Sequence, residues 1–176
     1  MSRALVTSEE GASAEQEFAG LFREHYQFMY RTAYSVTGSR QDAEDAVQAI
    51  FLRLMQRPLR LKTTTKAYLY RAAVNQALST LRSRKRIDVS EDVEQLLPQV
   101  LSPGDPISDT IRQALQDAMA RLRPRAVEIL ILHYEHNYSD QEIAGMLNAT
   151  RGTIAVTLFR ARARLKKLMT RSLARR

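Results

Sequence analysis

The stretch SDQEIAGMLNATRGTI, residues 139–154, predicts two short helices joined by a tight turn. Ser139 and Glu142 form a capping-box pair at the start of the first helix, and Thr150 is placed to cap the second. The second helix then continues into the basic segment 160–164. This is the layout of a helix-turn-helix, in which the second helix enters the major groove of DNA.

The apolar positions of this motif would form the small core that sets the angle between its two helices. Side chains outside that core are available to DNA, where Arg addresses guanine edges or phosphate and Thr or Ala meets the thymine methyl group. The alternative is an ordinary helical hairpin on a protein surface, but capping, spacing and the basic end together favour DNA. The predicted core comprises Ile143, Ala144, Leu147, Ile154, Leu158 and Ala161.

The composition of the 176-residue chain restricts the classes of protein to which it can belong. It has 27 Lys and Arg against 19 Asp and Glu, a formal charge of +8 that suits nucleic acid or a membrane surface. The absence of cysteine excludes disulfides and thiolate metal sites. Residues 1–16 lack a secretory signal, and no apolar run approaches the roughly 20 residues that span a bilayer. We therefore expect a soluble cytoplasmic protein with no membrane insertion.

Helical periodicity runs through both halves of the chain without strand-like alternation, so the predicted fold class is all-α. Residues 88–120 carry seven acids and one base, and the segments before and after them are basic. Pro98, Pro103, Gly104 and Pro106 mark much of this acidic stretch as a linker. We predict two small helical domains, divided as follows: a flexible N-terminus at 1–13, a first domain at 14–87, the acidic proline-containing linker at 88–107, and a second domain with the helix-turn-helix at 108–176.

The first domain is expected to contain three helices. The first ends at Gly38, which can adopt the left-handed conformation, and Ser39 can cap the second, which stops before Pro58. On that second helix Asp45, Gln48 and Leu52 share one face. A polar strip with apolar borders can bind a partner helix, or it can simply be the solvent-exposed side of an amphipathic helix.

The third helix, from about residue 63 to 86, ends in the basic run 82–86 and carries Tyr68, Tyr70 and Asn75. Single-stranded bases stack on aromatic rings while phosphates meet Arg and Lys, so this helix is a candidate nucleic-acid site. A basic helix end can equally complement the helix dipole on a solvated face. The residues by themselves leave both interpretations open.

No arrangement of side chains predicts catalysis or metal binding. His133, Glu135 and His136 lie close in sequence, but two His near a helix end without a third ligand are a weak metal signal. The chain lacks a glycine-rich phosphate loop, a nucleophile elbow and paired carboxylates. We expect no enzyme, no metal and no cofactor.

Three segments, in this order, resemble bacterial sigma factors of the extracytoplasmic-function group in the sigma-70 superfamily. Residues 42–53 resemble the segment that binds core RNA polymerase, and residues 68–78 followed by Arg82 resemble the segment that melts and reads the downstream promoter element. Residues 122–125, 142–144, 152–154 and 160–162 resemble the reader of the upstream element. The likeness extends from about Phe18 to Leu168.

The resemblance implies an alternative sigma factor that directs promoter recognition and DNA melting for the polymerase. Its partners would be the clamp helices of the largest polymerase subunit, the flap of the second-largest, promoter DNA and an anti-sigma factor, which could hold it at the inner membrane. The implied residues are Asp42, Asp45, Gln48, Phe51 and Leu52 for polymerase; Lys66, Tyr68, Arg71, Asn75, Arg82 and Arg84 for the downstream element, where a base would flip into a pocket; and Arg151, Thr153, Ala155, Val156, Thr157, Arg160 and Arg162 for the upstream element.

The chain departs from the family pattern at four positions. Ala49 stands where the family often has Glu, and Val74 where it often has Arg. Ala155 and Thr157 replace cations that are common in the recognition helix, which should weaken the phosphate contribution to affinity. We therefore expect an unusual upstream element, or one read through methyl groups and DNA shape.

Three other functions compete with a sigma factor. A stand-alone helix-turn-helix regulator would bind duplex DNA without polymerase, as a dimer on two half-sites. An interaction module would sequester an anti-sigma factor without starting transcription. A nucleic-acid-modifying enzyme would need a set of reactive residues that the sequence lacks.

Overall fold

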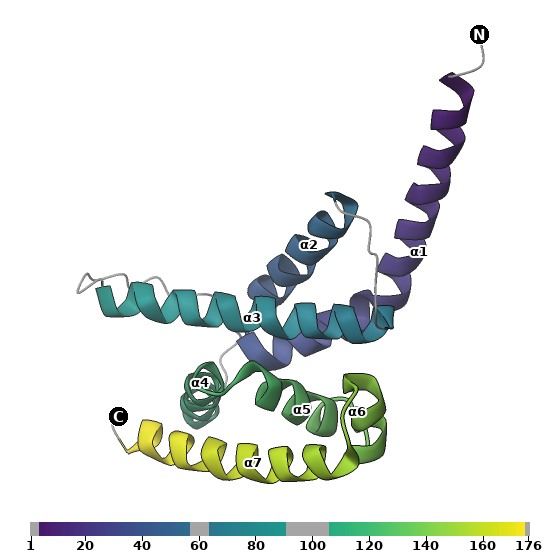
Figure 1. The fold of residues 1–176 in the computed structure, drawn as a ribbon. Coiled ribbons are helices and arrows are strands. Elements are labelled where there is room, and N and C mark those ends of the chain that lie inside the picture. Colours follow the sequence, from purple (N-terminus) through teal and green to yellow (C-terminus); the bar gives the residue numbers. More distant parts are fainter. Residues whose placement is uncertain (1–3, 57–63, 91–105, 175–176) are drawn as a thin grey trace.

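A computed structural model describes residues 4–56, 64–90 and 106–174 of the chain. These ranges fold into α-helices without a strand, so the all-α prediction is confirmed (Figure 1). The helices in chain order are α1 (Ala4–Thr37), α2 (Arg40–Gln56), α3 (Thr65–Ser90), α4 (Pro106–Ala120), α5 (Pro124–Tyr134), α6 (Asp140–Leu147) and α7 (Arg151–Leu173).

The first three helices pack on one another around an apolar cluster. The turn between α1 and α2 uses Gly38, whose φ of +63° favours glycine, and its N–H donates to Tyr34 O at 2.7 Å. The backbone N–H of Asp42 then donates to Ser39 Oγ at 3.3 Å, so the predicted cap of the second helix is present. The cluster is formed by Met29, Val47, Ile50, Phe51, Leu54, Leu69 and Ala73.

The last four helices form the second unit, in which α6 and α7 pack against each other and against α5. Pro124 begins α5, where its missing N–H costs no hydrogen bond. All six residues of the predicted helix-turn-helix core are buried, as the apolar spacing predicted.

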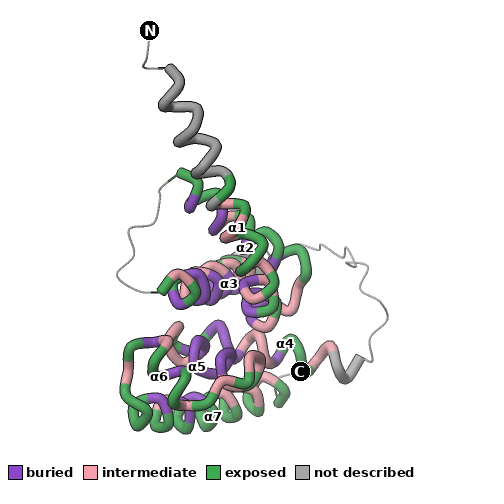
Figure 2. Tube along the Cα trace, turned by 90° about the vertical axis from the view of Figure 1, so that its right-hand side faces the viewer, coloured by how far each residue is buried: buried purple, intermediate pink, exposed green. Residues whose placement is uncertain are grey.

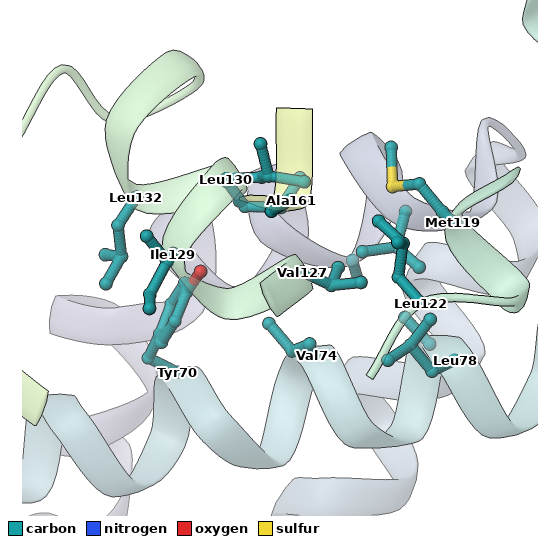
Figure 3. Close-up of a cluster of buried hydrophobic side chains, with 14 of the residues drawn as sticks. Tyr70, Val74, Leu78, Met119, Leu122, Val127, Ile129, Leu130, Leu132 and Ala161 are labelled. Atoms are coloured by element: carbon teal, nitrogen blue, oxygen red, sulfur yellow. The ribbon is translucent and has the colours of Figure 1, made fainter. Parts of the chain in front are cut away.

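The two halves also pack directly on each other. Tyr70, Val74 and Leu78 of α3 belong to the same buried cluster as Leu122 and Val127 of the second half. Figure 3 shows these α3 side chains pointing toward those of α4 and α5. Figure 2 shows buried residues on α3 and α5, which lie next to each other. The chain therefore adopts a closed arrangement, which the expectation of two domains separated by a linker did not anticipate.

The helix boundaries differ from the predicted ones near the termini and the linker. The stretch 1–13 was expected to be loose, but α1 begins at Ala4. The α3 helix continues to Ser90 and α4 begins at Pro106, so both ends of the predicted linker 88–107 are helical. The rest of that linker, residues 91–105, lies outside the described residues.

Candidate nucleic-acid and partner interfaces

The caps predicted for the helix-turn-helix are present in the structure. Ser139 Oγ accepts from Glu142 N at 3.3 Å, and Glu142 Oε2 accepts from Ser139 N at 2.8 Å. Ser139 Oγ also donates to Glu142 Oε2 at 2.7 Å, and this bond, together with that from Ser139 N, lowers the pKa of the Glu142 carboxyl. Asn148 takes a left-handed φ of 50° at the turn, and Thr150 Oγ1 accepts from Thr153 N at 3.2 Å. The turn is thereby set by local hydrogen bonds.

The outer face of α7 is open to solvent along its first four turns. Six of the seven residues predicted for the upstream element are exposed: Arg151, Thr153, Ala155, Val156, Arg160 and Arg162. The exception is Thr157, which is half-buried and donates its hydroxyl to Thr153 O at 2.7 Å. Arg162 Nη1 also donates to Tyr134 Oη at 3.2 Å.

One exposed side chain on α7 was missed by sequence reasoning. Phe159 is 67% exposed, next to Arg160. The signal was present, because Phe159 falls off the stripe formed by Ile154, Leu158 and Ala161. A large apolar side chain outside that stripe has no place in the core, so α7 presents an aromatic ring as well as cations.

The predicted polymerase-binding residues of α2 separate into an exposed set and a buried set. Asp45, Gln48 and Leu52 are exposed, and Leu52 is 58% accessible. Met55, one turn further along, is exposed as well and was not predicted. These four residues form a surface that we call the α2 face.

Two residues predicted for the same contact, Asp42 and Phe51, are buried. Asp42 is 6% exposed and pairs with Arg84 at 2.6 Å, because it lies four and eight residues before the core residues Ala46 and Ile50. Burial raises the pKa of the Asp42 carboxyl, although Arg84 opposes the shift. Phe51 packs against the rings of Phe18 and Phe22. In this structure neither side chain is presented to a partner.

A hollow of about 520 Å³ lies beside α3 and α2. It brings together three residues that the family resemblance assigned to the downstream element, Tyr68, Arg71 and Asn75. Sequence reasoning did not identify its other lining residues, which come from both helices, since that juxtaposition depends on how α2 packs on α3. They are Ile50, Arg53, Ala72, Gln76 and Ser79.

The cations predicted for the downstream element do not gather on one open face. Arg84 is held by Asp42 within the first half. Lys66, Arg71 and Arg82 instead bond to groups of the second half, as set out below. Most of the cations predicted for the downstream element are therefore not among the residues that line the hollow.

The remaining titratable and apolar features indicate no metal centre or membrane span in the described part of the chain. No group of three or more potential metal ligands occurs there, and none of its helices combines the length and apolar character of a membrane-crossing segment. The His136 ring packs 4.3 Å from the Phe28 ring, and its Nε2 lies 2.8 Å from Thr32 Oγ1. That histidine serves the contact between the two halves.

Comparisons with known proteins match the two halves of the chain to two sigma-70 regions, in chain order. The family model Sigma-70 region 2 matches residues 21–87, and Sigma-70, region 4 matches residues 112–165. The RNA polymerase sigma-E factor of Streptomyces antibioticus is 30% identical over 160 residues, covering 89% of this chain and 87% of that protein.

A second relative and a solved structure extend the comparison. The ECF RNA polymerase sigma factor SigE of Mycolicibacterium smegmatis is 28% identical over 156 residues. The match covers 86% of this chain but only 61% of the length of that relative. The structure of CnrH in complex with the cytosolic domain of CnrY has the same fold, with a TM-score of 0.53 and 18% identity over 94% of this chain and 96% of that one. Since both sigma-70 regions match in order, and a relative 30% identical spans most of both chains, the chain belongs to the extracytoplasmic-function group of sigma-70 RNA polymerase sigma factors.

Proposed function

We propose that the α2 face is the surface through which this sigma factor docks on core RNA polymerase, at the clamp helices of the largest subunit. The observation that carries the proposal is the exposure of Asp45, Gln48, Leu52 and Met55 on one side of α2. A helix that leaves Leu and Met in water beside a carboxylate and an amide is suited to a partner helix. Ala49 beside it, where the family often has Glu, would remove one polar contact.

For the downstream promoter element we propose the hollow beside α3 as the site of a flipped base. Tyr68 offers a ring on which a base can stack, and Asn75 and Gln76 offer amide donors and acceptors for its edge. Once free, Arg71 would meet the adjoining phosphate. The enzyme chemistry of transcription belongs to the polymerase, and the sigma factor contributes recognition and strand separation.

For the upstream element we propose the outer face of α7 in a major groove. Arg160 and Arg151 would contact phosphate or guanine, while Ala155, Val156 and Phe159 would contact thymine methyl groups. The apolar side chains support the expectation of an upstream element read partly through methyl groups. The second half would also contact the polymerase flap.

We propose in addition that an anti-sigma factor controls the protein, either in the cytoplasm or at the inner membrane. The support is family membership together with a solved structure of the same fold, whose title names a complex with the cytosolic domain of a second protein.

The docking proposal is tested by the affinity of the protein for core polymerase. We expect the variant Asp45→Arg to lose tight binding, because it reverses the one charge among the four residues of the α2 face. Glu24→Arg is the matched control: it makes the same charge change on α1, at a side chain that is 75% exposed and remote from the α2 face in sequence.

Three outcomes of this measurement are informative. Loss of binding in Asp45→Arg alone supports docking through α2. No polymerase binding by the unmodified chain, with duplex DNA binding retained, would instead indicate a stand-alone regulator. Binding to neither would leave the interaction module.

A further inference from the structure

Arg82 of α3 caps the end of a helix in the second half. Arg82 Nε donates to Ala120 O at 3.0 Å, and its Nη2 donates to Leu122 O at 3.0 Å. Ala120 is the last residue of α4. The carbonyls at a helix C-terminus lack intrahelical partners and carry the negative end of the helix dipole. They therefore offer a guanidinium the type of acceptor that a phosphate oxygen would offer.

The same pairing occurs at the end of α6. Arg71 Nη2 donates to the carbonyl oxygen of Leu147, the last residue of α6, at 3.1 Å, and Arg125 Nη2 donates to the same oxygen at 2.9 Å. Arg71 Nε is buried without a partner. An unpaired buried donor costs about 1–3 kcal/mol. A ligand whose oxygen also accepted from Arg71 Nε would therefore satisfy this guanidinium better than Leu147 O does.

Further contacts make this an extensive packed interface. Lys66 Nζ donates to Tyr138 Oη at 2.7 Å, and Tyr70 Oη donates to Glu128 O deep in the contact. At the rim, Arg31 Nη2 pairs with Glu135 Oε1 at 2.8 Å. We call the contact of α1 and α3 with the second half, made by these residues and the apolar cluster of Figure 3, the closed interface.

The cations of the two proposed DNA-reading surfaces are engaged differently. Three of the four cations predicted for the downstream element, Lys66, Arg71 and Arg82, are bonded across the closed interface. The cations of α7, Arg151 and Arg160 among them, remain exposed. Figure 1 shows α7 on the side of the second half that faces away from α3.

We propose that the second half is a built-in competitor of promoter DNA for the downstream-reading arginines of α3. The C-terminal carbonyls of α4 and α6 occupy the guanidiniums that strand-separated DNA requires, so the two halves must part before that DNA binds, whereas duplex DNA reaches α7 in either state. The proposal rests on the proposed DNA-binding function. A ligand that binds only the open form has an apparent dissociation constant equal to its intrinsic one divided by the open fraction, so its apparent affinity rises as the open fraction rises.

The Arg31–Glu135 pair provides variants that act on the closed interface without touching any proposed DNA contact. Arg31→Glu and Glu135→Arg each place like charges together, and their net charges change in opposite directions. The double variant restores an opposite-charge pair. Glu24→Arg serves as a control for added positive charge. Circular dichroism of each variant checks that its helices are retained.

Separation of the halves is measured in the full chain by energy transfer between two dyes. The chain has no cysteine, so Gln27→Cys on α1 and Gln141→Cys on α6 give two unique labelling positions, both exposed. DNA binding is measured with two probes, a random-sequence single-stranded oligonucleotide and the corresponding duplex.

We expect both single variants to lower energy transfer and to bind single-stranded DNA roughly three- to tenfold more tightly, with little change for the duplex. The double variant should return both readouts toward those of the unmodified chain. Affinities that follow net charge, rising in Glu135→Arg and falling in Arg31→Glu, would overturn the proposal. Opening without tighter single-strand binding would also overturn it. Absence of DNA binding in every form, open or closed, would refute the DNA-binding function itself.

Discussion

The α3 and α7 helices are both candidate DNA readers, but the fold treats them differently. On α3 three of the four predicted cations bond to the second half of the chain, beside the buried apolar residues of the same helix. On α7 the predicted residues line an open face, above a buried stripe of three residues. The difference shows that a basic helix is not by itself an available one: availability depends on what packs against the side chains that border the reading face.

The largest expected effect comes from removing an aromatic ring from each of the two helices and comparing the losses of stability. Tyr70 on α3 is fully buried and Phe159 on α7 is 67% exposed. We expect Tyr70→Ala to lower the free energy of unfolding by about 3–5 kcal/mol, as for other large buried rings. Phe159→Ala should change it by about 0.5 kcal/mol or less. Chemical denaturation of both variants measures these free energies of unfolding. Similar losses of stability in the two variants would contradict the difference in burial between Tyr70 and Phe159.

A second test compares the arginines of the two helices by their salt dependence. Each phosphate contact adds about one unit to the slope of log affinity against log salt. We therefore expect Arg160→Ala to lower the slope for duplex DNA by about one unit. Arg71→Ala should leave duplex binding as it is, because Arg71 is engaged across the closed interface. An unchanged slope in Arg160→Ala would count against α7 as the duplex reader.

A smaller effect is expected from pH, acting on the closed interface alone. Burial lowers the pKa of His136 to about 4, while Glu135 opposes the shift and Arg31 and Lys66 add to it. In the open state the ring would titrate near its ordinary pKa of 6.5. The open state thus binds more protons below that pH, so the stability of the closed interface is complete above about 6.5 and falls as pH drops toward 4.

Energy transfer between the two labelled positions, followed from neutral to acidic pH, would measure this opening. His136→Gln removes the titrating ring while keeping a polar side chain, and should flatten the response in that window. If the Gln variant opened over the same pH range as the unmodified chain, other groups would have to account for the pH dependence.

Most of the local structure was predictable because it depends on residues close in sequence. The capping box of Ser139 and Glu142, the cap at Thr150 and the turn at Gly38 all follow from side chains acting within a few residues. Apolar spacing likewise identified the buried stripe of the helix-turn-helix.

The composition of the candidate surfaces was predicted less well. Spacing grouped Asp45, Gln48 and Leu52 correctly on one exposed face, but the family resemblance added Asp42 and Phe51, which lie on the buried side of α2. Phe159 was passed over although it lies off the apolar stripe. The lining of the hollow beside α3 could not be found from one helix, since α2 supplies Ile50 and Arg53.

The sequence by itself determined the helices, their caps, the helix-turn-helix and, through three ordered segments, membership of the sigma factor group. Only the tertiary structure decided that the two halves close on each other and that Arg71 and Arg82 bond to helix ends in the second half. The physical reason lies in the acceptors. They are backbone carbonyls, which every residue carries, so no side-chain pattern marks them, and they become binding groups only where a helix ends beside a cation.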